Sequence, residues 1–145
     1  MEDAVWLDFA FVEKFIVEIF KKIGVPESDA KICADVLIAA DKLGIDSHGV
    51  NRLKPIYYDR IKAGIQYPVT NFEIVRETPT TAVIDGHDGM GMVIAARANQ
   101  MAIDKARKLG LGMVVVRNST HYGIAGYYPL KAVEQGMIGI TGTNA

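Results

Sequence analysis

Residues 81–141 alternate between short apolar runs and longer helical patterns, and this order limits the folds that the chain can adopt. The runs Thr81–Ile84, Met113–Val116 and Met137–Thr141 predict strands, and the residues between them predict helices. Strands separated by a helix usually pair in parallel through a right-handed crossover. We therefore predict an α/β fold in which these three strands run in the same direction, preceded by a strand at Phe72–Val75. The run 113–116 lacks polar alternation, which predicts a strand covered on both faces.

The first seventy residues have a different pattern, in which apolar residues recur at helical spacing. Residues 12–23 predict an amphipathic helix, residues 26–43 predict a second helix, and a third pattern runs from 47 to 64. We expect two units, a helical segment at 1–70 and an α/β part at 71–145. Because the sequence stops directly after the last predicted strand, we expect it to be part of a longer polypeptide.

The composition argues against several classes of partner. Sixteen basic and seventeen acidic residues leave a formal charge of -1, and no segment forms the basic stripe that nucleic acid would require. No apolar run is long enough to cross a bilayer, and the acidic start differs from a secretory signal, so we expect a cytoplasmic protein without a membrane partner. The single cysteine, Cys33, cannot form an internal disulfide and is expected in the core.

The segment Asp46-Ser47-His48-Gly49 is the first candidate site, because Arg52 follows His48 by four residues. If a helix begins at Ser47, the imidazole and the guanidinium lie on one face. A guanidinium suits a substrate carboxylate, and an imidazole can exchange protons near neutral pH. In the alternative interpretation, Asp46 or Ser47 caps the helix and both basic groups face solvent.

The second candidate is His121, in the polar loop Asn118–Gly123 that follows the strand at 113–116. Ligands bind at the carboxyl edge of open α/β sheets, so this loop could hold a general base. A loop histidine that bonds only to backbone groups is the alternative. The three histidines show no metal-ligand spacing, so no metal site is expected.

A glycine cluster at Gly86–Gly91 lies between a predicted strand and a helix. Glycines in this position can let a pyrophosphate approach the helix N-terminus. The spacing differs from G-x-G-x-x-G, however, and no acidic residue ends the next strand. We favour a tight turn over a dinucleotide loop.

Several segments, in this order, resemble the type-2 malate/L-lactate dehydrogenase family, which includes sulfolactate dehydrogenase-like enzymes, ureidoglycolate dehydrogenase and piperideine-2-carboxylate reductase. They are Asp46–Val50, Arg52-Leu53, Asp85-Gly86, Asn118–Gly123 and Thr143–Ala145. The resemblance implies a non-Rossmann, sulfolactate dehydrogenase-like fold, with an N-terminal helical segment before a βαβαβ part. It also implies NAD or NADP as cofactor and a homodimer, in which residues 1–70 contribute to the substrate site and the dimer. Residues 71–145 would then be the first part of the cofactor-binding domain.

The same resemblance assigns roles to individual residues. His121 is implied as the catalytic acid/base, Ser47 and His48 as a proton-relay pair, and Arg52 as the group that binds the substrate carboxylate. The implied cofactor contacts are His121, Tyr122, Gly123, Ile124, Ala125 and Asn144.

The expected function is therefore an NAD(P)-dependent oxidoreductase that transfers hydride between a nicotinamide and a small 2-hydroxy acid such as malate or lactate. One alternative is a cyclic imine reductase of the same family. Another is a non-catalytic ligand-binding or dimerisation module. An enzyme requires that His48, Arg52 and His121 converge, whereas a module leaves them on separate surfaces.

Overall fold

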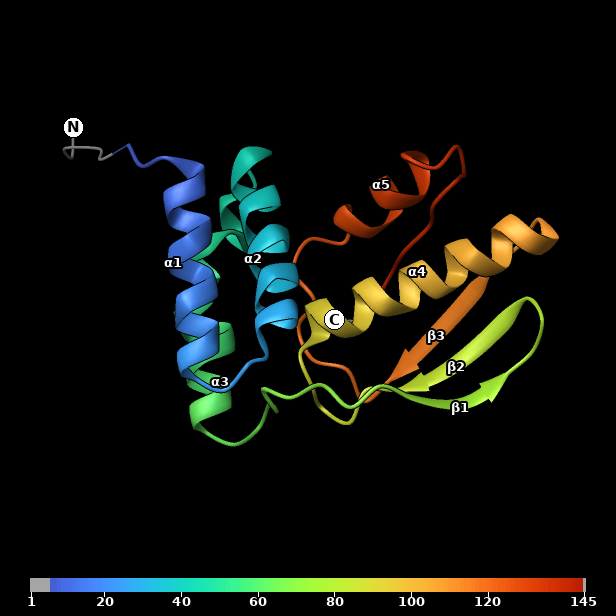
Figure 1. The fold of residues 1–145 in the computed structure, drawn as a ribbon, viewed down its shortest axis with the longest axis horizontal. Helices are drawn as coiled ribbons and strands as arrows, with labels where there is room; N and C mark the ends of the chain where they lie inside the picture. The colour runs from blue at the N-terminus through green and yellow to red at the C-terminus, as the bar shows by residue number, and fades with distance from the viewer. Residues whose placement is uncertain (1–5, 145) are drawn as a thin grey trace.

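A computed structural model of the chain describes residues 6–144 (Figure 1). Its first part contains helices α1 (Phe9–Lys22) and α2 (Glu27–Lys42), the 3-10 turns η1 (Asp46–His48) and η2 (Val50–Arg52), the π-helix η3 (Leu53–Tyr58) and the short α3 (Asp59–Lys62). The second part contains β1 (Glu73–Glu77), β2 (Thr81–Asp85), α4 (Gly91–Leu109), β3 (Met113–Arg117) and α5 (Tyr127–Val133). The helical start and the α/β second part agree with the predicted order.

The main core joins the two parts of the chain. Ile16 and Phe20 of α1 pack with the buried face of α2, and the first turn of α4 closes the same cluster. Each large apolar side chain buried there contributes about 1.5–3 kcal/mol relative to an exposed one. Cys33 of α2 is fully buried in this cluster, and its burial raises the pKa of the thiol, which confirms the prediction of a core residue.

The sheet has the order β1-β2-β3, with β1 antiparallel to β2 and β2 parallel to β3. Thr81 pairs with Met113 and Asp85 with Arg117, so the predicted parallel pair is confirmed. Helix α4 makes the crossover and lies along one face of the sheet in Figure 1, where it buries Ala82 and Ile84. The parallel strands β2 and β3 end at the same edge of the sheet, and the loop with His121 follows β3 there.

Two predictions about strands are wrong. Met113 and Val115 are 56% and 47% exposed, so residues 6–144 cover only one face of β3. Residues 137–141 form no strand in the described part of the chain, although Ile138 and Ile140 alternate with less exposed neighbours. A β-pattern becomes a strand only where a second strand accepts its ladder of hydrogen bonds. Here the N–H of Met137 instead donates to the Ala132 carbonyl at the end of α5.

Candidate active site

The two candidate histidines lie together, although they come from different parts of the chain. His48 belongs to the turn after α2, and His121 belongs to the loop after β3. Their ring centroids are 5.5 Å apart, and the ring planes differ by 26°. Both residues remain partly accessible to solvent, so a small ligand can reach the pair.

The turn that carries His48 is not the single helix that its sequence predicts. Gly49 has a ψ of -152°, which separates two short 3-10 turns, and a π-helix follows. The side chain of Asp41, at the end of α2, accepts a hydrogen bond from the N–H of Val50 at 2.9 Å. A Cβ atom at position 49 would overlap the Asp41 carboxylate. Gly49 and its contact with Asp41 therefore interrupt the predicted helix. The assumption that His48 and Arg52 share one helix face is wrong.

Arg52 nevertheless stays close to the histidines. Its Nε donates a hydrogen bond to the Ser47 carbonyl, and Ser47 Oγ lies 2.8 Å from Nδ1 of His48. Neither terminal nitrogen of the Arg52 guanidinium has a hydrogen-bond partner within residues 6–144. The two N–H groups that match a carboxylate in a forked geometry are therefore available.

Two groups hold one ring nitrogen of His121. The hydroxyl of Tyr57 lies 2.8 Å from Nδ1, and the N–H of Gly123 donates to the same atom at 3.2 Å. The Gly123 contact makes Nδ1 an acceptor, so the neutral ring carries its proton on Nε2, the nitrogen that is left for a ligand. Tyr57 is fully buried, and burial raises the pKa of its phenol, which therefore stays protonated.

Tyr57 lies within the helical pattern at 47–64, which predicts no role for its hydroxyl in the site. A buried tyrosine usually finds a hydrogen-bond partner, so the phenol itself was the signal for a nearby acceptor. Its partner lies 64 residues further along the chain, which local spacing cannot reveal.

The surroundings of His121 keep its imidazole neutral. Burial lowers the pKa of His121 below its usual value, and positive charge on His48, Arg60 and Arg52 lowers it further. A histidine with a lowered pKa is unprotonated at neutral pH and can accept a proton. Arg60 was not recognised from the sequence as a residue of this environment.

The glycine cluster before α4 packs against the loop of His121. Thr120 Oγ1 donates to the Gly89 carbonyl at 2.6 Å and accepts a hydrogen bond from Gly91 N at 3.0 Å. A Cβ at position 91 would overlap the carbonyls of Thr120 and His121. Because this N–H is already bonded and residues 89–94 are buried, the cluster is a close-packed turn, as favoured from its spacing.

The predicted cofactor contacts fall into two groups. Ala125 is exposed beside the partly accessible His121, and a Cβ at Gly126 would meet open space. This edge of the loop therefore carries small, uncharged residues. Gly123 and Ile124 are buried against the chain itself, so their predicted cofactor contacts are left untested.

Tyr122 and Asn144 are placed differently. The ring of Tyr122 stacks on Tyr128 with centroids 5.2 Å apart, and its buried hydroxyl has no hydrogen-bond partner in the described structure. Asn144 is exposed, and no polar contact within residues 6–144 joins it to either histidine. The structure therefore brings together Ser47, His48, Arg52 and His121, but not Asn144.

An open groove of about 650 Å³ between α4 and the β1–β2 turn contains none of the candidate catalytic residues. Residues 6–144 hold no group of three or more His, Cys, Asp or Glu side chains arranged for a metal ion. None of their helices is both long enough and apolar enough to traverse a bilayer.

Comparisons with known proteins agree with this geometry. The chain is 54% identical over 131 residues to malate dehydrogenase from Pyrococcus abyssi, and 50% identical over 132 residues to L-sulfolactate dehydrogenase from Methanocaldococcus jannaschii. These alignments cover 90% and 91% of this chain but 36% and 38% of the two relatives. The solved structure of malate dehydrogenase from Pyrococcus horikoshii matches with a TM-score of 0.90 and 46% identity, over 94% of this chain and 39% of that one.

A family model described as malate/L-lactate dehydrogenase matches residues 7–145, which is nearly the whole chain. The fold, the order of the motifs and the convergence of the two histidine turns are all compatible with this match. The chain therefore belongs to the malate/L-lactate dehydrogenase family.

Proposed function

We propose that the full-length protein containing this chain is an NAD(P)-dependent dehydrogenase of small 2-hydroxy acids. The observation that carries this proposal is the meeting of His48, Arg52 and His121 around one accessible point. Relatives named for malate and L-sulfolactate support a 2-hydroxy acid with a second anionic group as the substrate class.

Arg52 binds the substrate carboxylate in this mechanism. Its Nε is anchored on the Ser47 carbonyl, so the guanidinium plane is held and the two terminal nitrogens remain available for the carboxylate. A held carboxylate fixes C2 relative to the cofactor, and such alignment can contribute several kcal/mol to the lowering of the barrier. Arginine suits this task because its planar fork forms two parallel hydrogen bonds.

His121 acts as the base when the hydroxy acid is oxidised. Its Nε2 takes the hydroxyl proton in the tautomer whose ring proton lies on Nδ1 and is donated to the Tyr57 hydroxyl, a tautomer in which the Gly123 N–H no longer donates to Nδ1. In the same step the C2–H bond breaks and the C2=O bond forms. A nicotinamide bound beside C2 would supply the acceptor for the hydride. The lowered pKa of His121 keeps the imidazole in the form that accepts this proton. A positioned base typically contributes about 10²- to 10⁴-fold to the rate.

Ser47 and His48 then relay the proton toward solvent. The Ser47 hydroxyl contacts Nδ1 of His48, and the stacked His48 ring lies beside His121. Protonation of His48 also disfavours a second positive charge on His121, since the two rings repel when both are charged. The pair therefore helps to keep His121 unprotonated between turnovers.

The remaining parts of the proposal follow from the family resemblance. The cofactor is NAD or NADP, held at the accessible edge of His121 and Ala125 and at Tyr122–Ile124 and Asn144. The enzyme is a cytoplasmic homodimer, and residues 1–70 contribute to the substrate site and to the dimer.

The test uses the full-length protein with malate, lactate and sulfolactate and with both cofactors, and follows the formation of reduced nicotinamide. Turnover of at least one acid, lost in His121→Ala while cofactor binding persists, supports the proposal. A cyclic 2-carboxy imine is assayed alongside. If the protein reduces this imine and oxidises none of the acids, the imine reductase alternative replaces the proposal.

A further inference from the structure

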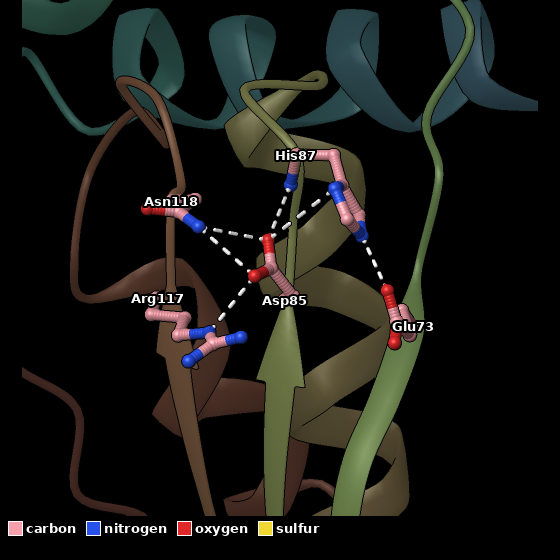
Figure 2. Close-up of polar contacts among 5 residues, drawn as sticks. All are labelled: Glu73, Asp85, His87, Arg117 and Asn118. Atoms are coloured by element: carbon pink, nitrogen blue, oxygen red, sulfur yellow. Dashed lines mark hydrogen bonds and ion pairs between the residues drawn. The ribbon is translucent and has the colours of Figure 1, made fainter.

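A buried carboxylate at the end of β2 joins the loops that follow β2 and β3. Figure 2 shows Asp85 at the centre of this cluster, with Arg117 and Asn118 on one side and His87 on the other. Asp85 is 4% exposed and accepts hydrogen bonds from Arg117 Nε at 2.8 Å and from His87 N at 3.0 Å. The Asn118 amide donates to both carboxylate oxygens, at 3.0 and 2.9 Å.

The backbone around this carboxylate is held in an unusual conformation. His87, Asp88 and Asn118 have φ values of 46°, 54° and 49°, and they are the non-glycine residues with positive φ in the described chain. L-residues enter this region at an energetic cost, and they persist there only where surrounding contacts enforce it. Two backbone hydrogen bonds also hold this conformation. They run from Gly86 N to the Arg117 carbonyl and from Asp88 N to the Asn118 carbonyl.

The same pair of loops carries His121. Thr120, one residue before His121, bonds to both Gly89 and Gly91 through its hydroxyl. The backbone of the His121 loop is thus fixed twice to the loop after β2, first at Asn118 and then at Thr120. Within residues 6–144 no side-chain contact joins Asp85 itself to His121, so any effect on the imidazole passes through the loop.

We infer that Asp85 is a positioning residue for His121, acting through Asn118 and Thr120. Its carboxylate holds Asn118 in the left-handed conformation, which presents Thr120 to the glycine turn and sets the direction of the His121 ring toward Tyr57. The catalytic consequence rests on the proposed function, whereas the effect on the His121 environment does not. The Glu73 side chain, which contacts His87 at the exposed rim, has no part in this path.

The decisive comparison is Asp85→Asn against Glu73→Gln in the full-length protein. An asparagine at position 85 loses the anion that binds Arg117 and one acceptor of the Asn118 amide. We expect kcat for the hydroxy acid to fall by about 10²-fold, the size of loss that a misplacement of about 1 Å produces. The KM for the acid should change little, because Arg52 and its Ser47 anchor lie outside the cluster. Glu73→Gln should keep both values.

A second readout does not need activity. The pKa of His121, followed by the NMR titration of its ring protons, should rise toward an ordinary histidine value in Asp85→Asn. The ring then leaves the half-buried position beside His48, Arg52, Arg60 and Tyr57 that lowers its pKa. A loss of melting temperature with an unchanged His121 pKa and unchanged kcat would overturn the inference. If the wild-type protein oxidises no hydroxy acid, the proposed function fails, and this titration still decides the positioning role.

Thr120 supplies a pair of variants that does not remove a buried charge. Thr120→Val keeps the shape but loses the hydroxyl that bridges Gly89 and Gly91, whereas Thr120→Ser keeps the hydroxyl. The inference predicts a raised His121 pKa and a reduced kcat in the valine variant, with rescue in the serine variant. Equal behaviour of the two variants would overturn it, even if Asp85→Asn does not fold.

Discussion

The hydroxyl of Tyr57 lies 2.8 Å from Nδ1 of His121, and this contact joins the helical segment to the loop after β3. Because Gly123 N also donates to Nδ1, the imidazole is held through one nitrogen and presents the other. Rotation of the His121 ring about its χ angles would break both contacts. The orientation of the proposed base therefore depends on a residue of η3, far from His121 in the sequence.

Tyr57→Phe tests this relationship. The phenylalanine keeps the buried ring but removes the hydrogen bond, whose net worth is roughly 0.5–1.5 kcal/mol. We expect kcat to fall by about the corresponding 2- to 13-fold, with little change in the KM of the acid. The matched control is Tyr58→Phe, because Tyr58 is adjacent but its hydroxyl has no hydrogen bond in the described structure. Equal losses in the two variants would argue against a role for the Tyr57 hydroxyl.

The pH dependence follows from the lowered pKa of His121. The neutral form is the base, so kcat/KM for oxidation should rise with pH through a pKa below the usual 6.5 and then level off. Arg60→Gln removes a positive charge that disfavours the protonated form, so the pKa should rise and the acid limb should move to higher pH. Lys62→Gln, two residues further along α3, is the control for a general loss of positive charge. An unchanged pH midpoint for the rise of kcat/KM in Arg60→Gln would contradict the effect of Arg60 on His121.

Gly49 should not tolerate a side chain. In Gly49→Ala the new Cβ displaces the Asp41 carboxylate and leaves the N–H of Val50 without its partner. An unsatisfied buried donor costs about 1–3 kcal/mol, so the melting temperature and kcat/KM should both fall. Gly126→Ala is the stability control, because Gly126 has a φ of -62° and open space around a Cβ. Differential scanning calorimetry should separate the two variants, and a stable Gly49→Ala protein would contradict the packing described for this turn.

Arg52→Lys tests the binding of the carboxylate. An ammonium cannot reproduce the planar fork, and hydrogen bonds to charged groups contribute about 1.5–3 kcal/mol each. We expect kcat/KM for 2-hydroxy acids to fall by about 10- to 150-fold. Lys54→Arg, a change on the exposed side of the same segment, should have no effect. Near-normal kcat/KM in Arg52→Lys would remove Arg52 from the proposed site.

Much of the α/β part could be predicted because its determinants are local. The apolar runs 81–84 and 113–116 and the helical pattern between them are enough to place β2, α4 and β3. The run 137–141 has a similar pattern, yet it has no neighbouring strand in the described structure. Local pattern predicts the tendency to form a strand, whereas pairing depends on another segment.

The candidate site was predicted in part. Its residues came from the family resemblance, but the single helix predicted at 47–64 does not form. His48 and His121 do meet, but the break at Gly49 depends on Asp41, eight residues earlier, and on a close contact between backbone and carboxylate. Tyr57, Arg60 and Asp85 act on His121 through contacts that join residues far apart in the chain. Spacing within one segment carries no information about such contacts.

The central claim is that His121 and Arg52 face one bound anion. It is tested most directly by the pKa of His121 in the full-length protein, measured by NMR with and without a saturating 2-oxo acid. Because a carboxylate on Arg52 offsets the positive charge that lowers this pKa, the account predicts that the pKa rises on binding and that Arg52→Ala abolishes the rise. A bound 2-oxo acid that leaves the His121 pKa unchanged would contradict it.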